Sequence, residues 1–290
     1  MSTRAESYLV GLIGDGVMPS LTPPMHERAA QVHGLHYLYR PIDLAELNLP
    51  ASDIGELLHA GAKLGFNAFN VTHPCKQLVL DHLDDISPTA RAIGAVNTVV
   101  IQDGKFIGHN TDASGFIRGL HDGLPGAAKR KVLQLGAGGA GAAVAYALLA
   151  DGTEELHIVD LDEERVEHRV RELQKHFPHA SVHAATPGHV PQLLGQVDGL
   201  LNATPIGMHH HPGLPLDLAA LEPRHWVADC IYRPVDTELI VAARDLGCQV
   251  LDGGHMAVGQ AVDAFEIITG IRPDTQQVRS HLLELLDKGL

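Results

Sequence analysis

The stretch that decides the fold of this chain is Val132-Leu133-Gln134-Leu135-Gly136-Ala137-Gly138-Gly139-Ala140-Gly141. It reads as a buried strand, a glycine turn and the first turn of a helix. In such a stretch Gly136 permits the tight turn, Gly138 lets the backbone approach a pyrophosphate, and Gly141 lets the helix lie close to the strand. The stretch predicts a dinucleotide-binding loop. The alternative is a tight strand-to-helix turn with no ligand.

The residues around the glycine loop favour the first interpretation. A small-residue run, Ala142 to Ala150, continues the helix and is closed by Asp151-Gly152. The next apolar strand, Leu156 to Val159, ends in Asp160. This is near the distance at which an acidic residue accepts from the ribose hydroxyls of a dinucleotide.

Length and composition describe a globular protein that is long enough for two domains. The chain has 290 residues, of which 45% are hydrophobic and 19% charged, and only 4% are aromatic. A core built mainly from Ala, Val, Leu and Ile favours an α/β design. The net charge of −14 argues against nucleic acid or an anionic membrane as partner, because both require a basic face.

Cysteine and histidine usage predicts neither a disulfide framework nor a metal site. Cys75, Cys230 and Cys248 are scattered and lack paired ligand spacing. The run His209-His210-His211 lies between Gly207 and Pro212-Gly213, and we expect a solvated loop there. The first residues lack the apolar run of a signal peptide and no segment reaches membrane-spanning length. We expect a soluble cytoplasmic protein.

Strands alternate with helices along the chain, which predicts parallel sheets. The turn Leu124-Pro125-Gly126 precedes the glycine loop, and a domain boundary is expected between Asp112 and Lys131. We expect one domain on either side of this boundary. The expected strands are Tyr8–Gly14, His36–Arg40, Phe66–Val71, Gly94–Ile101, Val132–Leu135, Leu156–Val159, Ser181–Ala184, Val197–Asn202, Trp226–Tyr232 and Gln249–Asp252. The expected helices start at Met25, Ile54, Pro74, Phe116, Ala142, Asp162, Met256 and Val278. The helix from Ile54 is expected to run to Leu64 and to end at Gly65.

Two polar clusters follow strands of the first domain. Ser20 and Thr22 lie two residues apart in a proline-rich loop that we expect to be extended, so both hydroxyls can face the same way. Alternatively, one of them could cap the following helix. Asn70 and Thr72 share one face at the end of the third strand, and Lys76 follows in the next helix. Ligands gather at that edge of open α/β sheets, but a lone lysine there is most often a solvated surface charge.

Two further polar residues stand at positions that call for a partner or a purpose. Asn97 occurs in the apolar stretch Gly94–Ile101, where propensity disfavours an amide. Asp112 precedes the helix that we expect from Phe116. On this segment alone, helix capping is the simpler interpretation of Asp112.

In combination these motifs resemble the shikimate dehydrogenase family over nearly the whole chain. They match most closely its quinate/shikimate dehydrogenase branch. The matching stretches, in the family's order, are Ser20-Leu21-Thr22-Pro23, Asn70-Val71-Thr72-His73-Pro74-Cys75-Lys76, Gly94-Ala95-Val96-Asn97-Thr98, Gly108-His109-Asn110-Thr111-Asp112, the glycine loop, Asn202-Ala203-Thr204-Pro205 and Gln260-Ala261.

The resemblance implies two α/β domains with a cleft between them. The first is a substrate-binding domain of residues 1–115, completed by the C-terminal helices in 256–290, and the second is a Rossmann domain of residues 116–255. It implies reversible hydride transfer between a nicotinamide and the ring C3 secondary alcohol of quinate or shikimate, giving 3-dehydroquinate or 3-dehydroshikimate. Lys76 matches the catalytic acid/base and Asp112 its orienting and charge-balancing partner, and an ammonium at that place would stabilise developing alkoxide charge. The substrate-binding set implied is Ser20, Thr22, Asn70, Thr72, Lys76, Asn97, Asp112 and Gln260.

Three departures from the common pattern refine the expectation. Thr22 stands where many members have Ser, and Gly16 and Pro19 replace the commoner Pro and His of that loop, which resembles the quinate-active branch. Biosynthetic members commonly carry an Asn-Arg-Thr run suited to a ribose phosphate, whereas this chain has Asp160-Leu161-Asp162. Carboxylates there would repel a phosphate, so NAD is the expected cofactor.

The expected cofactor-binding set combines the glycine loop with the positions that the resemblance implies. Arg165 could stack on adenine, which leaves some NADP use open. The full set is Gly136, Ala137, Gly138, Gly139, Ala140, Asp160, Arg165, Asn202, Ala203, Thr204, Pro205, Met208, Cys230, Tyr232, Gly253 and Met256.

The sequence thus predicts an NAD-dependent quinate/shikimate dehydrogenase acting as a monomer or homodimer on small-molecule substrates. One alternative is a strictly shikimate-specific, NADP-dependent biosynthetic enzyme. The other is a nucleotide-responsive binding protein that keeps the fold without turnover, against which the presence of both Lys76 and Asp112 counts.

Overall fold

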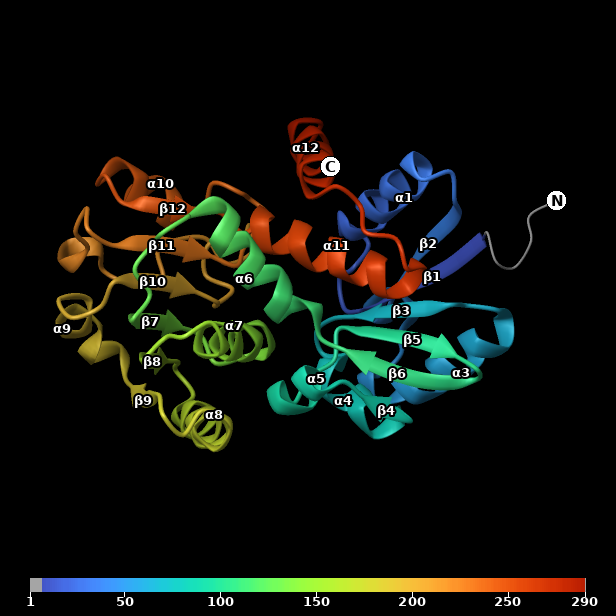
Figure 1. Cartoon of the computed structure of the whole chain (residues 1–290), viewed down its shortest axis with the longest axis horizontal. Coiled ribbons are helices and arrows are strands. Elements are labelled where there is room, and N and C mark those ends of the chain that lie inside the picture. Colours follow the sequence, from blue (N-terminus) through green and yellow to red (C-terminus); the bar gives the residue numbers. More distant parts are fainter. Residues whose placement is uncertain (1–6, 290) are drawn as a thin grey trace. The chain divides into compact units, whose positions relative to one another are not determined.

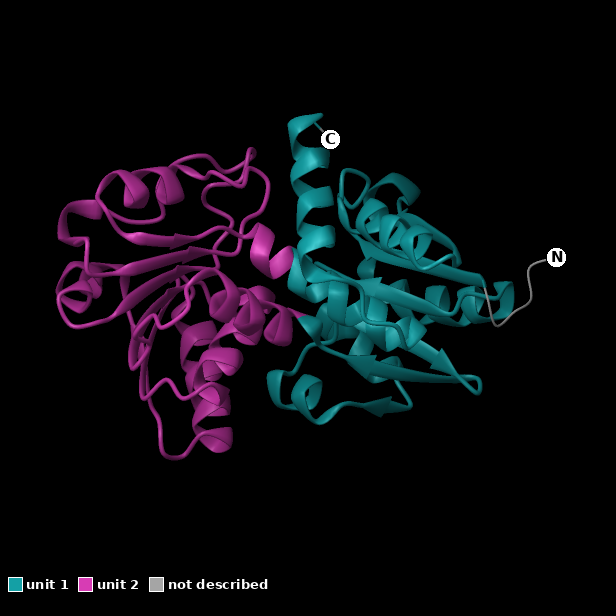
Figure 2. Ribbon diagram, turned by 45° about the horizontal axis from the view of Figure 1, so that its top comes forward, with its two compact units in different colours: residues 1–111, 258–290 teal, residues 112–257 magenta. Residues whose placement is uncertain are grey.

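The computed structural model describes residues 7–289, and these form two compact units (Figure 2). The first comprises the chain up to Thr111 together with the residues from Val258 onward, and the second runs from Asp112 to Ala257. Both passages between the units fall inside a helix, α6 (Thr111–Gly123) and α11 (Gly254–Thr269). These passages lie a few residues from the boundaries at 115 and 255 that the sequence suggested.

The first unit is built on a six-stranded sheet of order β2-β1-β3-β5-β6-β4 (Figure 1). Its elements are β1 (Ser7–Gly14), α1 (Thr22–Val32), β2 (His36–Asp43), α2 (Leu44–Leu47), η1 (Ala51–Asp53), α3 (Ile54–Leu64), β3 (Ala68–Val71), α4 (Cys75–Leu78), η2 (Val79–His82), β4 (Asp85–Ile86), α5 (Pro88–Ile93), β5 (Thr98–Gln102) and β6 (Lys105–His109), with most of α11 and α12 (Thr275–Asp287).

This sheet is mixed, which corrects the expectation of an all-parallel one. The pairs β1–β2, β1–β3 and β4–β6 are parallel, but β5 runs antiparallel to both β3 and β6. The β5–β6 pair follows from the turn between these two strands, where Asp103 and Gly104 both have positive φ. A two-residue turn of this kind can join only antiparallel neighbours.

Several element starts in the first unit differ from the sequence expectation. Helix α1 begins at Thr22 instead of Met25, because prolines are tolerated in the first helical turn, where an N–H has no intrahelical partner. Strand β5 begins at Thr98 because Gly94 takes a left-handed conformation that ends α5. Helix α6 begins at Thr111 instead of Phe116. Helix α3 has the predicted bounds, and Gly65 ends it with φ 89°.

The core of the first unit lies between this sheet and the helices packed on it. Its buried side chains come from β1, β3, β5 and α3, among them Ile13, Phe69, Val99 and Leu58. A methyl group at Gly61 of α3 would lie 2.2 Å from the ring of Phe69, so this glycine lets the helix approach the sheet. Tight packing of this kind positions the strand ends that carry the polar residues of the first unit.

The second unit has a six-stranded parallel sheet of order β12-β11-β10-β7-β8-β9, which confirms the Rossmann-type expectation. Its elements after α6 are β7 (Lys131–Leu135), α7 (Gly139–Ala150), β8 (Glu155–Val159), α8 (Glu163–His176), β9 (Ser181–Ala185), η3 (Pro187–His189), α9 (Val190–Leu194), β10 (Gly199–Asn202), η4 (Leu218–Ala220), β11 (Trp226–Asp229), α10 (Glu238–Asp245) and β12 (Gln249–Leu251).

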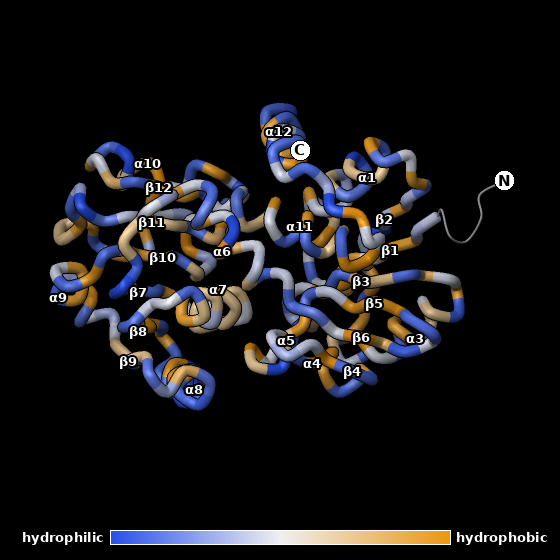
Figure 3. Tube along the Cα trace, viewed as in Figure 1, coloured by the Kyte–Doolittle hydropathy of each residue, from blue (hydrophilic) through white to orange (hydrophobic). Residues whose placement is uncertain are grey.

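The helices of this unit differ in how much of their surface is buried. Most residues of α7 are buried and the tube is coloured toward hydrophobic along its length, whereas α8 is mainly hydrophilic with hydrophobic intervals (Figure 3). Helix α7 carries mostly Gly and Ala in its first turns, so it can pack closely on the sheet. This closeness is what the glycine loop at its N-terminus requires.

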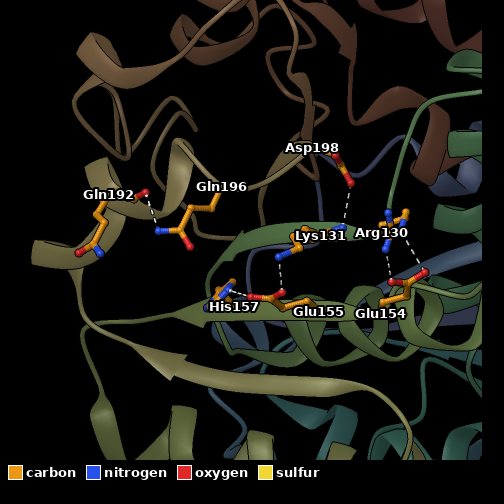
Figure 4. Close-up of polar contacts among 8 residues, drawn as sticks. All are labelled: Arg130, Lys131, Glu154, Glu155, His157, Gln192, Gln196 and Asp198. Atoms are coloured by element: carbon orange, nitrogen blue, oxygen red, sulfur yellow. Dashed lines mark hydrogen bonds and ion pairs between the residues drawn. The ribbon is translucent and has the colours of Figure 1, made fainter.

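Charged side chains pair at the amino ends of the central strands, away from the glycine loop (Figure 4). Lys131 and Glu155 are register partners at the start of β7 and β8, and their side chains form an ion pair at 2.8 Å. His157 contacts the same carboxylate at 2.8 Å, and the backbone N–H of Lys131 donates to Asp198. Such partly exposed ion pairs contribute little stability, typically about 0.2–1 kcal/mol each.

Candidate active site and cofactor-binding edge

The polar residues of the first unit are tied together by the backbone where β1 and β3 end. The N–H of Thr72 donates to Ile13 O at 2.9 Å, and that of Val71 to Asn97 O at 2.8 Å. The carbonyl of Lys76 accepts from the N–H of Val96 at 2.9 Å. The segments that carry Asn70, Thr72, Lys76 and Asn97 are therefore neighbours at one edge of the sheet.

Asn70 and Asn97 are joined through a buried hydroxyl that the sequence argument did not single out. Thr98 is fully buried, and its Oγ1 accepts from Asn70 Nδ2 at 2.9 Å and donates to Asn97 Oδ1 at 3.1 Å. Tyr39, which is also buried, donates its hydroxyl to Asn70 Oδ1. Because each amide group has a defined partner, the orientation of both side chains is set before any ligand arrives.

Asn97 is held from its other side by the start of α6. The N–H of Thr111 donates to Asn97 Oδ1 at 2.8 Å, and Asn97 Nδ2 donates to Thr111 Oγ1 at 3.0 Å. These contacts give the purpose for an amide in an apolar stretch. They also correct one detail, because Asn97 precedes strand β5 instead of lying inside it.

Ser20 and Thr22 lie at the start of α1, both half-buried. Thr22 is the first helical residue, so the extended conformation assumed for this pair is wrong. Ser20 Oγ accepts from the N–H of Thr22 at 3.3 Å. The preceding loop is held by Asp43, which accepts from the N–H groups of Gly16 at 3.0 Å and Met18 at 3.2 Å. Desolvation raises the pKa of Asp43, but these hydrogen bonds together outweigh it, and the net pKa is lowered.

Lys76, Asp112 and Gln260 come from three different helices. Lys76 is half-buried in the short helix α4, and Gln260 is half-buried on α11. Asp112 is buried in the first turn of α6, one residue after the helix begins, so the interpretation of Asp112 as the N-cap is wrong. Lys76 and Gln260 belong to the first unit and Asp112 opens the second. Their catalytic and binding roles stay predictions.

In the second unit the glycine loop has the geometry that its sequence predicted. Gly136 has φ +97°, and a methyl group there would lie 2.6 Å from the carbonyl oxygen of Ala203. A methyl group at Gly141 would lie 2.3 Å from the carbonyl oxygen of Gly136. A methyl group at Gly138 would meet no atom within 4 Å. Gly136 and Gly141 are thus required by the fold, whereas Gly138 leaves open space at the N-terminus of α7. Binding of a pyrophosphate in that space stays a prediction.

Asp160 follows β8 and turns its carboxylate toward the glycine loop. Its Oδ2 accepts from the N–H of Ala137 at 2.8 Å, and its Oδ1 accepts from the N–H of Asp162 at 3.2 Å. Arg165 is paired with Asp162 at 2.8 Å and lies 3.6 Å from Asp160. Leu161 between the two acids is 86% exposed.

The other expected cofactor residues follow the remaining strands at the same edge. The N–H of Cys230 donates to Asn202 O at 2.9 Å, and a methyl group at Gly253 would lie 2.2 Å from the carbonyl oxygen of Ile231. The ends of β7, β10, β11 and β12 are therefore in contact. Thr204, Tyr232 and Ala203 are half-buried, Met256 is buried, and Pro205 and Met208 are exposed.

Asp229 is a buried acid at this edge that sequence reasoning missed. Desolvation raises its pKa, although hydrogen bonds from Ile231 N–H, Thr237 and Asn202 oppose the shift. Asn202 in turn accepts from the hydroxyl of Thr204 at 2.7 Å, so the acid holds the loop that follows β10. An aspartate closing an apolar strand was the available signal, since buried acids need partners.

Among the described residues no group of His, Cys, Asp or Glu has the geometry of a metal site, and the three cysteines are free thiols. Within residues 7–289 there is likewise no helix whose length and apolar character would let it cross a membrane.

Comparisons with known proteins agree with this fold and with the predicted family. Residues 12–99 match the family model of the shikimate dehydrogenase substrate binding domain. The chain is 63% identical over 286 residues, covering 99% of this chain and 98% of the relative, to a protein of Pseudarthrobacter chlorophenolicus named shikimate dehydrogenase (NADP(+)). It is 45% identical over 281 residues, covering 97% and 99%, to a protein of Corynebacterium efficiens named quinate/shikimate dehydrogenase (NAD(+)).

A solved structure matches over almost the whole chain. The quinate dehydrogenase from Corynebacterium glutamicum in complex with NAD superposes with a TM-score of 0.92 at 45% identity, covering 96% of this chain and 99% of that one. The matched proteins thus carry names with both nicotinamide cofactors.

Proposed function

Because this chain belongs to the shikimate dehydrogenase family, we propose that it is an NAD-dependent quinate/shikimate dehydrogenase. It oxidises the ring C3 secondary alcohol of quinate to 3-dehydroquinate and that of shikimate to 3-dehydroshikimate, reversibly. The glycine loop, the open space at Gly138 and the N-terminus of α7 fit a dinucleotide pyrophosphate.

One observation supports NAD over NADP above all others, namely the arrangement of charges after β8. Asp160 accepts from Ala137 at one oxygen and keeps its carboxylate at the loop, where it can accept from both ribose hydroxyls. The only guanidinium that these contacts place beside it, that of Arg165, is paired with Asp162 and lies close to Asp160. A ribose phosphate there would be repelled by the carboxylates of Asp160 and Asp162. Arg165 is already paired with Asp162, so it is not free to neutralise the phosphate.

In the proposed reaction Lys76 accepts the proton of the substrate hydroxyl. A bound nicotinamide would supply the acceptor for the hydride that leaves the ring carbon. The neutral amine of Lys76 takes the hydroxyl proton as the carbonyl forms, and the resulting ammonium stabilises negative charge on the oxygen during the transfer. Asp112 orients Lys76, balances its charge and can share in the proton transfer.

The remaining polar residues of the first unit recognise the substrate. The hydroxyls of Ser20 and Thr22 bind the carboxylate. Asn70, Thr72, Asn97 and Gln260 bind ring hydroxyls or frame the pocket. The buried contacts of Asn70 and Asn97 support this assignment, because they hold both amides in fixed orientations. A substrate analogue without the matching hydroxyl would leave a buried amide unpaired and would bind more weakly.

A second candidate is the NADP-dependent, shikimate-specific enzyme. The name of the 63% identical relative favours it, and the charges around Asp160 oppose it. A binding protein without turnover is the third candidate, which the presence of Lys76 and Asp112 opposes.

Steady-state kinetics with quinate and shikimate, each against NAD and NADP, test the proposal. We expect turnover of both substrates and a higher kcat/KM with NAD. A preference for NADP with shikimate alone would support the second candidate. Absence of reaction in all four pairs, with nucleotide binding retained, would support the third.

A further inference from the structure

A glutamine stands in the centre of the second unit's sheet, where an apolar residue is expected. Gln134 lies on β7, between β10 and β8, and pairs in register with Leu201 and Ile158. Its exposed fraction is 0%, and Oε1 has no hydrogen-bond partner within the described part of the chain. A buried amide with an unsatisfied oxygen destabilises the fold compared with a leucine at the same position. The glutamine at position 134 therefore calls for a compensating role.

The amide nitrogen of Gln134 supplies that role. Nε2 donates to the carbonyl of Gly136 at 2.8 Å and to the carbonyl of Gly141 at 2.9 Å. Both hydrogens of the amide are therefore used, one on each end of the glycine loop. The opposite orientation would place Oε1 against two carbonyl oxygens, which fixes the way the amide points.

The peptide between Gly136 and Ala137 is held on both sides. In a trans peptide the C=O of Gly136 and the N–H of Ala137 point in opposite directions. The carbonyl is held by Gln134 and the N–H by the Asp160 carboxylate, at 2.8 Å each. A rotation of this peptide would turn its carbonyl toward a carboxylate and its N–H toward an amide NH2. Both contacts oppose that rotation.

We propose that Gln134 is a positioning residue for the dinucleotide, which acts by clamping the Gly136–Ala137 peptide against Asp160. The clamp fixes the position of the loop backbone that binds the pyrophosphate. It also fixes the Asp160 carboxylate, whose remaining lone pairs accept from the ribose hydroxyls. This inference rests on the proposed function for the identity of the cofactor, but the clamp itself applies to either nicotinamide.

The test compares Gln134→Met with a matched control, Leu201→Met, its equally buried register partner on β10. Methionine keeps the length of glutamine and removes both donors. We expect Gln134→Met to raise the KM and the equilibrium dissociation constant for NAD about tenfold. Its kcat at saturating NAD and its KM for the ring substrate should stay within about twofold, and its Tm within about 5 °C. Leu201→Met should leave all of these near wild type.

A second variant separates the clamp from general packing. In an Asp160→Ser background one side of the clamp is already lost, so Gln134→Met should raise the NAD dissociation constant less than threefold there. Gln134→Leu replaces Gln134→Met if the methionine variant does not fold. Unchanged NAD affinity in a folded variant would overturn the proposal. A parallel loss of Tm and of affinity for both substrates would also overturn it.

The wild-type measurements keep the two proposals distinguishable. A wild-type preference for NADP refutes the proposed cofactor, and the clamp is then tested by the same ratios with NADP. If the wild type has no turnover, the dissociation constants of NADH and NADPH, measured from their fluorescence, still report the effect of Gln134→Met.

Discussion

Thr98 Oγ1 accepts a hydrogen bond from Asn70 Nδ2 at 2.9 Å and donates to Asn97 Oδ1 at 3.1 Å, so one hydroxyl orients two proposed substrate amides. Thr98→Val keeps the shape and removes this link. We expect the KM for quinate and shikimate to rise about tenfold and the free energy of unfolding to fall by about 1–3 kcal/mol, because two buried polar groups lose a partner. Thr98→Ser, which retains the hydroxyl, should restore most of both. Wild-type KM values in Thr98→Val would show that the link does not orient the amides.

Lys76→Ala removes the proposed acid/base. We expect turnover to fall by roughly two or more decades, the usual scale for such a loss, with NAD still bound. Lys63→Ala, at an exposed lysine in the last turn of α3, is the control and should be silent. Turnover near wild type in Lys76→Ala would remove Lys76 from the mechanism.

Asp160→Ser removes the charge that opposes a ribose phosphate. We expect the ratio of kcat/KM with NADP to that with NAD to rise about tenfold, equivalent to roughly 1.4 kcal/mol. Glu164→Ser, which removes an exposed carboxylate from the first turn of α8, controls for net charge. An equal change in both variants would point to a general charge effect.

The two glycines of the loop should respond differently to a methyl group. Gly141→Ala places a carbon 2.3 Å from the Gly136 carbonyl oxygen, and we expect a loss of about 1–3 kcal/mol in unfolding free energy. Gly138→Ala meets no protein atom within 4 Å, so the Tm should hold while the KM for NAD rises. A silent Gly138→Ala in both assays would place the pyrophosphate elsewhere.

His26 should make the stability of the first unit depend on pH. It is fully buried against Tyr37, Tyr39 and Phe265, and desolvation lowers its pKa to about 3. Between that value and 6.5 the unfolded chain binds a proton that the folded chain does not. Stability is therefore fully present above 6.5 and lost as the pH falls, with a slope of about 1.4 kcal/mol per pH unit from this group.

Urea unfolding at several pH values between 6 and 4 measures this slope. His26→Leu should reduce this slope by about 1.4 kcal/mol per pH unit, the contribution of one proton, whatever its effect on stability at neutral pH. His36→Gln, at an exposed histidine on β2, should leave the slope unchanged. An unaltered slope in His26→Leu would mean that His26 is protonated in the folded chain.

Local sequence patterns were enough for the features that depend on neighbours along the chain. The bounds of α3, with Gly65 at its end, follow from helical spacing and a left-handed glycine, and the glycine loop from the φ and contact demands at Gly136 and Gly141. The combination of motifs also identified the family. The same local view placed the starts of α1, β5 and α6 incorrectly, because packing and turn geometry set them.

Only the tertiary structure decided which polar groups act together. Asn70, Thr98 and Tyr39 come from three different strands. Gln134 and Asp160 both bind the peptide between Gly136 and Ala137, although neither is next to it in the sequence. Spacing along a strand says which way a side chain points but not what it meets. The partner is set by strand order and register, as where antiparallel β5 lies beside β3. By itself the sequence therefore determined the fold class and the family. The folded chain determined the mixed order of the first sheet and how the amides of the site and the peptide of the loop are held in place.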